Sequence, residues 1–260
     1  MSITELNSRS NEKIKYAAKI ASSSKFRYEN NAFFLQGVRL CYDAFLSKTP
    51  INQLFFTENA RDKNPEKIES LVSCAKQTYR INDSIASLLS ETKNNQGVFA
   101  VCEIPNIKIN RLKDSGKYIA LENIQDPANL GAITRTAEAL GIDGAVIANC
   151  CDPYNPKAQR AAMGSLLRLP LIFADDLPSF ILENSSYLFL ASTPDSSAEK
   201  ITETPFSEKV VAIIGNEGNG ISAETLSLCK KVTIPMLGRA ESLNASMAAA
   251  ILMWEMVREK

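Results

Sequence analysis

The chain has 260 residues, of which 45% are hydrophobic and 22% charged, and its 29 basic and 29 acidic residues leave no net charge. This composition is typical of a globular protein with a full core. The sequence has no histidine, which excludes Ser-His-Asp and Cys-His hydrolases, imidazole acid–base catalysis and metal sites with a histidine ligand. No apolar run approaches the roughly 18 residues of a membrane span. The polar N-terminus lacks the apolar core of a signal peptide, so we expect a cytoplasmic protein with no membrane partner.

The six cysteines are scattered, and none of them forms a C-x-x-C pair. In a long chain without a secretion signal this pattern favours reduced cytosolic thiols over disulfides or a metal site. We therefore expect no bound metal. A redox role for the neighbours Cys150 and Cys151 is a minor alternative.

The first part of the chain is basic: its first 39 residues hold seven Lys and Arg against three Asp and Glu. Apolar residues at helical spacing predict a leading helix over residues 10–27. Strand-like and helix-like runs then alternate, at 32–37, 38–48, 51–59, 65–76, 78–82, 83–92 and 97–104. This alternation predicts a small α/β domain over residues 1–105, and its basic start is compatible with a polyanionic partner.

Residues 106–116 are polar, basic and interrupted by proline and glycine, which is typical of a linker. Beyond them lies a second predicted domain, residues 117–260, with strand-like runs at 118–123, 144–149, 169–174, 187–192, 210–217 and 231–236. Helical segments lie between most of these runs. The pattern predicts a mainly parallel sheet covered by helices on both faces.

Three segments place small and polar residues just past a predicted strand, where ligands bind in open α/β sheets. The first is ENIQDPANLGAITRTAEALG, residues 122–141. Asn129 is a candidate N-cap for a helix that runs to Leu140 with an apolar stripe. Arg135 lies off that stripe and is therefore free to point into a cleft.

The second segment is VVAIIGNEGNGISAET, residues 210–225. Its glycines at 215, 218 and 220 allow the backbone to approach a ligand closely, and Ser222 is a candidate helix cap. The spacing G-x-x-G-x-G differs from the dinucleotide-binding G-x-G-x-x-G, and no P-loop lysine follows. These differences argue against a Rossmann enzyme and against a nucleoside-triphosphate site.

The third segment, residues 231–260, begins with a strand that ends at Ile234-Pro235 and continues through a loop to a final helix. Ser242, Asn244 or both are candidate caps of that helix. The helix is apolar on almost every side, so it should be buried by close packing. A partner subunit is a reasonable inference, because one protein face does not suffice to cover it.

Together the three segments resemble, in order and spacing, the signature motifs of the SpoU (TrmH) RNA ribose methyltransferases of the SPOUT class. The first motif matches at Asn129, Gly131 and Arg135. The other two match at Gly215, Asn216, Glu217 and Gly218, at Ile234-Pro235-Met236, and at Ser242-Leu243-Asn244-Ala245-Ser246. The resemblance covers roughly residues 117–258. More loosely, the first domain resembles the ribosomal-protein-like substrate-binding domain of several family members that modify ribosomal RNA.

The resemblance implies a trefoil-knotted α/β domain that works as a homodimer and uses S-adenosylmethionine to methylate a ribose 2′-hydroxyl of RNA. It implies cofactor contacts at Gly215, Asn216, Gly218, Ile234, Met236 and Leu243. It also implies catalytic roles for Arg135, Asn129, Glu217, Ser242 and Asn244. An activated methyl donor requires neither a metal nor a histidine, and the enzyme mainly aligns the acceptor oxygen and helps to remove its proton.

The role of Arg135 has two interpretations. The resemblance implicates it in activating the 2′-hydroxyl, but arginine is hardly ever deprotonated in proteins. A clamp on the RNA phosphate and on the developing alkoxide suits a guanidinium better. The sequence alone leaves both interpretations open.

Other functions also remain open at this stage. The chain could be an RNA-binding protein without catalysis, although the intact Arg135, Glu217 and Asn244 speak against that. Transfer RNA is the alternative substrate. The additional first domain favours ribosomal RNA, because folded RNA is recognised by shape over a wide surface.

Overall fold

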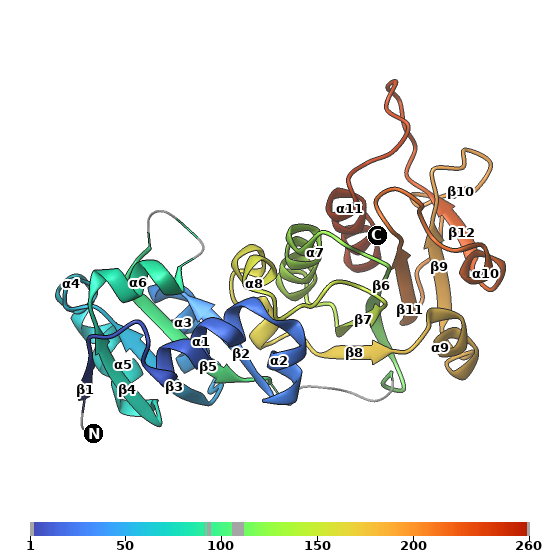
Figure 1. Ribbon diagram of the computed structural model, residues 1–260. Coiled ribbons are helices and arrows are strands. Elements are labelled where there is room, and N and C mark those ends of the chain that lie inside the picture. Colours follow the sequence, from blue (N-terminus) through green and yellow to red (C-terminus); the bar gives the residue numbers. More distant parts are fainter. Residues whose placement is uncertain (1–2, 91, 93–94, 106–111, 259–260) are drawn as a thin grey trace. The chain divides into compact units, whose positions relative to one another are not determined.

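The computed structural model describes residues 3–90, 92, 95–105 and 112–258. The chain divides into two compact units. The first contains the described residues of 1–106 together with Asp152–Leu167, and the second contains those of 107–151 and 168–260. Figure 1 shows both units and the labels of their elements. The division differs from three consecutive blocks at 1–105, 106–116 and 117–260, because a short segment of the later sequence groups with the first unit. Most of the predicted linker lies outside the described residues.

The first unit is built on a sheet in the order β1-β4-β3-β5-β2. Its strands are β1 (Ile3–Leu6), β2 (Ala32–Gln36), β3 (Ile51–Phe56), β4 (Gln77–Ile81) and β5 (Val98–Glu103). Strand β5 is antiparallel to both of its neighbours, β2 and β3, while β1, β4 and β3 are mutually parallel. The ends of β2 and β3 therefore lie at the same sheet edge as the start of β5.

Helices complete the first unit. They are α1 (Glu12–Ser22), α2 (Ser24–Glu29), α3 (Val38–Leu46), α4 (Glu58–Lys63), α5 (Pro65–Cys74), α6 (Asp83–Leu89) and α8 (Pro156–Ala162). One core forms where α1 and α6 bury Ile14, Ile20 and Ile85 with apolar side chains of the sheet. Helices α3 and α5 pack together and bury a further apolar face. The predicted leading helix is interrupted at Ser23, whose extended backbone ends α1 while its side chain caps α2 by accepting from the Phe26 N–H.

Residues Asp152–Leu167 are tied to the first unit by a buried ion pair. Arg27 is only 2% exposed, and its Nε and Nη2 both donate to Asp152 Oδ2 over 2.7 Å. The remaining Nη1 donates to the Ile20 and Ala21 carbonyls. Tyr154, also buried, packs against Phe33 with ring centroids 5.4 Å apart. A guanidinium is tolerated in a core when its donors are paired in this way.

The second unit has a seven-stranded sheet in the order β10-β12-β9-β11-β6-β7-β8. Its strands are β6 (Gly116–Glu122), β7 (Gly144–Ala148), β8 (Leu171–Ala174), β9 (Leu188–Ser192), β10 (Glu199–Lys200), β11 (Lys209–Ile214) and β12 (Lys230–Thr233). Every pairing in this sheet is parallel, which confirms the predicted α/β class. The six predicted strands are present, and the two-residue β10 is an addition that the sequence pattern did not indicate.

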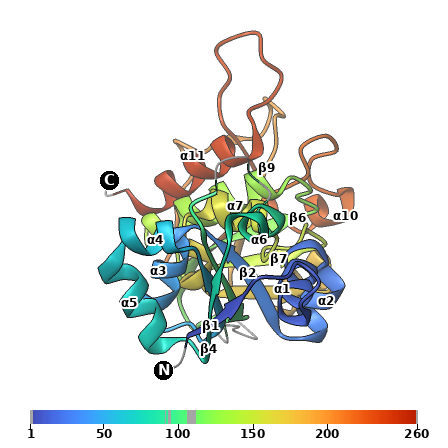
Figure 2. The same ribbon diagram turned by 60° about the vertical axis from the view of Figure 1, so that its left-hand side comes forward.

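Helices lie on both faces of this sheet. They are α7 (Pro127–Ala139), α9 (Leu177–Glu183), α10 (Ala223–Ser227) and α11 (Ala245–Val257). Helices α7 and α11 pack against each other and onto β6, β7 and β11, and Figures 1 and 2 show them side by side. Helix α9 contacts α10 and contributes Leu177 and Phe180 to the core of the unit.

The helix ends correct one prediction and confirm others. Asp126, not Asn129, caps α7, accepting from the Ala128 N–H, and Pro127 occupies the first helical position, where a missing N–H costs nothing. Ser222 caps α10, as predicted. Of the two candidates for α11, Asn244 is the cap, accepting from the Ser246 N–H over 2.9 Å.

Candidate functional site

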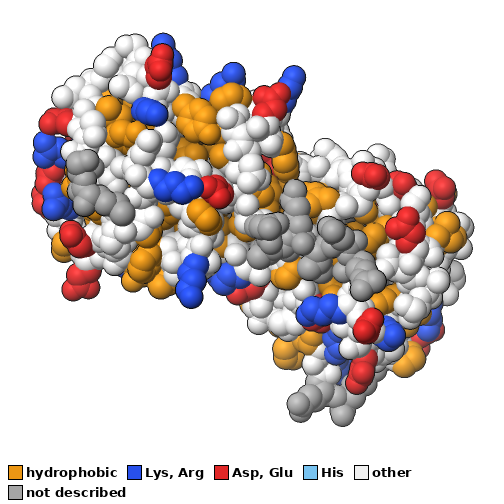
Figure 3. All heavy atoms as spheres, turned by 90° about the horizontal axis from the view of Figure 1, so that it is seen from below, with side chains coloured by type: hydrophobic (Ala, Val, Ile, Leu, Met, Phe, Trp, Pro, Cys, Tyr) orange, Lys and Arg blue, Asp and Glu red, His pale blue; other side chains and the backbone are white. Residues whose placement is uncertain are grey.

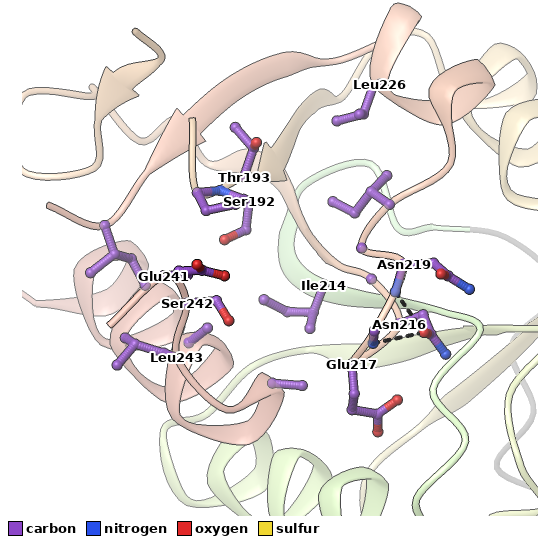
Figure 4. Close-up of a pocket in the computed structure, with 18 of the residues that line it drawn as sticks. Ser192, Thr193, Ile214, Asn216, Glu217, Asn219, Leu226, Glu241, Ser242 and Leu243 are labelled. Carbon is purple, nitrogen blue, oxygen red and sulfur yellow. Dashed lines mark hydrogen bonds between the residues drawn. The ribbon is translucent and has the colours of Figure 1, made fainter. Parts of the chain in front are cut away.

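A cavity of about 370 Å³ lies in the second unit where β9, β11 and β12 end. Because the three strands are parallel, their carboxyl ends meet at one sheet edge, which is where α/β sheets bind ligands. Figure 4 shows the residues after β12, including Ser242 and Leu243, opposite the turn that carries Asn216, with Ile214 between them. The lining contains no Lys or Arg and includes two carboxylates, those of Glu217 and Glu241.

The turn after β11 is held in a single shape by short hydrogen bonds. Asn216 and Gly220 exchange backbone N–H···O bonds of 2.9 Å. The Asn216 side chain accepts from the Gly218 and Asn219 N–H groups and donates to the Asn123 carbonyl. A Cβ on Gly215 would lie 2.3 Å from the Gly220 carbonyl carbon, so this position requires glycine for the close approach of two backbone segments. The turn therefore forms a rigid wall of the cavity.

Glu217 connects the three sequence motifs. Its carboxylate accepts from Asn129 Nδ2 at 2.9 Å and, at longer distances, from the Gln125 and Asp126 N–H groups. Asn129 Oδ1 in turn accepts from Asn244 Nδ2 at 3.0 Å, and Asn244 also caps α11. Partial burial raises the pKa of Glu217, but the donated hydrogen bonds outweigh it, so that the pKa lies below its ordinary value. The carboxylate is therefore ionised at neutral pH.

The structure brings most of the predicted site residues together. All six predicted cofactor contacts line the cavity, namely Gly215, Asn216, Gly218, Ile234, Met236 and Leu243. Glu217 and Ser242 line it as well, and Asn129 and Asn244 reach it through Glu217. Arg135 is the exception. It is exposed on α7, does not line the cavity, and forms no ion pair or side-chain hydrogen bond within the described part of the chain.

Several lining residues were not predicted from the sequence: Ser192, Thr193, Pro194, Leu226, Glu241 and Ala248. The polar run that follows strand β9 was the available signal for the first three. No sequence pattern indicates that β9 pairs with β11 and β12, because that pairing depends on long-range topology. Glu241 lies directly before the predicted motif residues and carries no pattern of its own.

Glu122 is a second carboxylate that the sequence did not single out. It is buried at the end of β6 and accepts hydrogen bonds from the Ser222 N–H, the Ser222 hydroxyl and the Thr225 hydroxyl, the last over 2.6 Å. A buried carboxylate requires such donors. Glu122 therefore anchors the start of α10, and with it the far end of the turn after β11.

The surroundings of Cys150, near the site, indicate a structural role for this residue. Cys150 Sγ accepts from the Ile124 N–H and donates to the Leu121 carbonyl, and burial raises its pKa to about 11. A thiol that is protonated at neutral pH is a poor nucleophile, which argues against the redox interpretation. Within the described residues, no cluster of acidic residues or cysteines is suited to a metal ion, and no helix is long and apolar enough to cross a membrane.

Two family models match the chain. Residues 116–254 match the SpoU rRNA Methylase family, and residues 11–100 match the MRM3-like substrate binding domain. Among proteins of known sequence, the chain is 31% identical to the 23S rRNA (guanosine(2553)-2'-O)-methyltransferase RlmP of Bacillus subtilis. The alignment covers 97% of this chain and 98% of that protein.

Solved structures give the same result. An rRNA methyltransferase from Sinorhizobium meliloti superposes with a TM-score of 0.86 at 25% identity, over 98% of both chains. The structure of an AdoMet-bound rRNA methyltransferase from the same organism gives a TM-score of 0.84 at 26% identity, over 98% of this chain and 97% of that one. The similarity therefore extends over both units.

Proposed function

Because the chain belongs to the SpoU rRNA methylase family, we propose that it transfers a methyl group from S-adenosylmethionine to a ribose 2′-hydroxyl of 23S ribosomal RNA. The observation that carries the proposal is the hydrogen-bonded connection of the three motifs, through Asn129, Glu217 and Asn244, beside the cavity. The Bacillus subtilis relative, whose alignment covers nearly the whole chain, is named a 23S rRNA methyltransferase, and this favours ribosomal over transfer RNA. We place this reaction in the cytoplasm.

The cavity fits the methyl donor. Its volume of about 370 Å³ lies within the range of small-molecule sites. Apolar side chains such as Ile234 and Leu243 suit an adenosine, and the loop hydroxyls and backbone groups suit its polar edges. The carboxylates of Glu217 and Glu241 suit the positive charge of a sulfonium. When bound, S-adenosylmethionine supplies an activated methyl group, and one of the similar solved structures, that of the Sinorhizobium meliloti rRNA methyltransferase, is AdoMet-bound.

The residues of the chain then position the acceptor. Glu217 is ionised and occupied by three N–H donors, so we assign it a positioning role: it fixes Asn129 and, through it, Asn244 at the edge of the cavity. Arg135 is left to hold an RNA phosphate and to stabilise negative charge on the acceptor oxygen. An exposed guanidinium that has no ion pair or side-chain hydrogen bond among the described residues is suited to both tasks.

We extend the proposal to a homodimer formed through α11. This helix buries one side in its own unit but leaves Met247, Ile251 and Trp254 between 38% and 58% exposed. These residues are four and three positions apart, so they form one apolar stripe. Such a stripe with a large aromatic residue is typical of an interface. We also propose that the loops around the cavity form the trefoil knot that the family resemblance implies.

Calorimetry and mapping test the proposed function. We expect the purified chain to bind S-adenosylmethionine or its demethylated product in the presence of a chelator. Mapping of 2′-O-methyl sites in ribosomal RNA, with and without the gene, should reveal one lost modification, and the purified protein should restore it on unmodified 23S RNA. A folded protein that binds neither ligand would overturn the proposal, as would an unchanged methylation map.

Light scattering on the full chain tests the dimer. We expect a dimer for the wild type and a shift toward monomer for the Ile251→Glu/Trp254→Glu variant, because each charge would have to be buried in the interface. A monomeric wild type at micromolar concentration would exclude the dimer. If the wild type and the variant are both dimers, the interface does not involve this face of α11.

A further inference from the structure

The first unit has a polar hollow of about 440 Å³ at one edge of its sheet. Strands β2 and β3 end here and β5 begins here, since β5 runs antiparallel to both. The Gly37 N–H donates to the Val98 carbonyl and the Thr57 N–H donates to the Gly97 carbonyl, over 2.8 and 2.9 Å. Both glycines have positive φ, 98° and 67°, which favours glycine at these positions. These backbone hydrogen bonds hold the ends of β2 and β3 against the start of β5.

Three basic side chains line the hollow: Arg39 from α3, Lys63 from α4 and Lys67 from α5. They face one acidic residue, Asp83. All three are exposed, and none forms an ion pair or side-chain hydrogen bond within the described part of the chain. The hollow therefore has an excess of positive charge that the protein does not neutralise.

Some other basic residues of the same unit are neutralised by ion pairs. Arg80 is paired with Glu5 and Glu58, and Lys76 is paired with Glu103. On the face drawn in Figure 3, basic and acidic side chains are likewise intermixed and do not gather into one large basic field. The hollow therefore concentrates three cations that have no ion pair among the described residues, although Lys67 Nζ lies 5.6 Å from the centroid of the Tyr42 ring. Such a concentration attracts a polyanion, whereas scattered and paired cations do not.

Amide side chains provide further polar groups in the hollow. Gln96 Oε1 accepts from the Val38 N–H over 2.9 Å and so caps α3, for which Gly37 has no side chain. Asn95 Oδ1 accepts from the Gly97 N–H, and Asn59 and Asn64 also line the hollow. The carboxamide N–H groups of such residues donate to phosphate, to ribose hydroxyls and to base edges.

We propose that this hollow binds the sugar–phosphate backbone of the RNA substrate, with Arg39, Lys63 and Lys67 on successive phosphates and the neighbouring amides on sugars or bases. This inference rests on the proposed function, because it assigns the RNA contact of the first unit to particular residues. The hydrogen-bonded strand ends fix the backbone from which α3 and α4 begin, and this limits where the exposed cations of these helices can reach, as shape recognition of folded RNA requires.

Two charge-matched double variants test the proposal. Lys63→Gln/Lys67→Gln removes two cations from the hollow, and Lys15→Gln/Lys48→Gln removes two exposed cations of the same unit that do not line it and have no ion pair among the described residues. The probe is unmodified 23S RNA transcript, with filter binding measured over a range of salt concentrations. We expect the first variant to bind at least about tenfold more weakly, with the slope of log K against log salt reduced by about one to two. The second should stay within about twofold of the wild type.

Equal losses in both variants would mean that RNA binding depends on total charge, and wild-type affinity in the first variant would mean that RNA binds elsewhere; either result overturns the proposal. Calorimetry with adenosine monophosphate is a second measurement. If the wild type binds this nucleotide and the first variant keeps its RNA affinity, the hollow is a mononucleotide site and not an RNA site. Both variants should bind S-adenosylmethionine like the wild type. If the wild type itself neither binds nor methylates RNA, the proposed function fails, and that outcome is distinct from failure of this inference.

Discussion

Each unit has a hollow at one end of its sheet, in the second unit where parallel strands end and in the first where β2 and β3 end and the antiparallel β5 begins, but the two linings carry opposite charges. In the second unit, Glu217 and Glu241 face the cavity and no Lys or Arg does. In the first unit, Arg39, Lys63 and Lys67 outnumber Asp83. The acidic lining in the second unit suits a cationic sulfonium, and the basic lining in the first unit suits an RNA phosphate.

The comparison shows how fold and ligand are related in this protein. Strand topology determines where a hollow forms, because the connecting loops leave the sheet and diverge at the strand ends. The side chains of the following loops then determine which ligand charge is favoured. Arg135 lines neither hollow, and we propose that it contributes to transfer and not to binding of the cofactor.

The largest effect is expected for Arg135→Ala. Single-turnover methylation of 23S RNA at saturating RNA should slow by about a hundredfold or more, the scale on which loss of one charge-stabilising donor acts. Melting temperature and cofactor affinity should change little, because the exposed side chain has no partner within the described residues.

Arg135→Lys separates the two proposed tasks of this residue, stabilising negative charge and gripping a phosphate. Lysine keeps the positive charge but loses the planar fork that grips phosphate. Partial rescue of the rate would point to charge stabilisation, and little rescue to bidentate positioning. Near-normal turnover by the alanine variant would show that Arg135 is not needed for transfer.

Arg27→Met should have the next largest effect, and it acts on stability. The substitution leaves Asp152, whose side chain is 10% exposed, without its ion-pair partner inside the first unit. Breaking a buried pair in this way costs about 3 kcal/mol of unfolding free energy. Thermal or urea denaturation measures the loss. Lys25→Met is the control, since its pair with Glu29 is exposed and contributes about 0.5 kcal/mol or less. Equal effects of the two variants would show that burial of the pair is unimportant.

The Arg27–Asp152 pair is a contact that no sequence pattern predicts. Alternating runs predicted both α/β folds, and three ordered motifs predicted the cavity residues. Sequence periodicity does not predict that Asp152–Leu167 packs with the first unit, because Arg27 and Asp152 lie 125 positions apart along the chain. Removing residues 1–105 to test RNA binding would uncover the buried Tyr154, so point variants are the better experiment.

The misassignments at the site have local physical causes. Asn129 has the right side chain for a cap, but Asp126-Pro127 offers a better start for α7, and this leaves Asn129 free to bond Glu217. No sequence motif indicates the hollow of the first unit. Its cations come from three separate helices, and only the fold brings them together.

Gly215→Ala should weaken cofactor binding without changing RNA affinity, which would sharpen the contrast between the hollows. The new methyl would lie 2.3 Å from backbone atoms of Gly220, so the turn would have to open. We expect at least about a tenfold loss of S-adenosylmethionine affinity by calorimetry, equivalent to about 1.4 kcal/mol. Gly238→Ala is the control, because a Cβ at that loop position meets nothing within 4 Å. A parallel loss of RNA affinity would mean that the two sites are coupled.

The smallest effect is expected for Glu217→Gln, and it should depend on pH. The amide keeps one acceptor oxygen but turns its N–H₂ toward the donors that the carboxylate satisfies, so the variant should melt at a lower temperature at pH 7. Glu217 is exposed by more than a third, and solvent screening limits the difference to about 1 kcal/mol or less.

The sign of the pH dependence follows from the lowered pKa of Glu217. A carboxyl whose folded pKa lies below its ordinary value of 4.5 stabilises the native state above that value. The stabilisation is lost as the pH falls through the folded pKa, because the protonated acid no longer accepts from all of its donors. The difference in melting temperature between wild type and variant should therefore be constant from pH 7 to about 5 and shrink below it. Taking the difference at each pH cancels the other titrating groups. A difference that stays constant on acidification would mean that the charge of Glu217 does not hold the three motifs together.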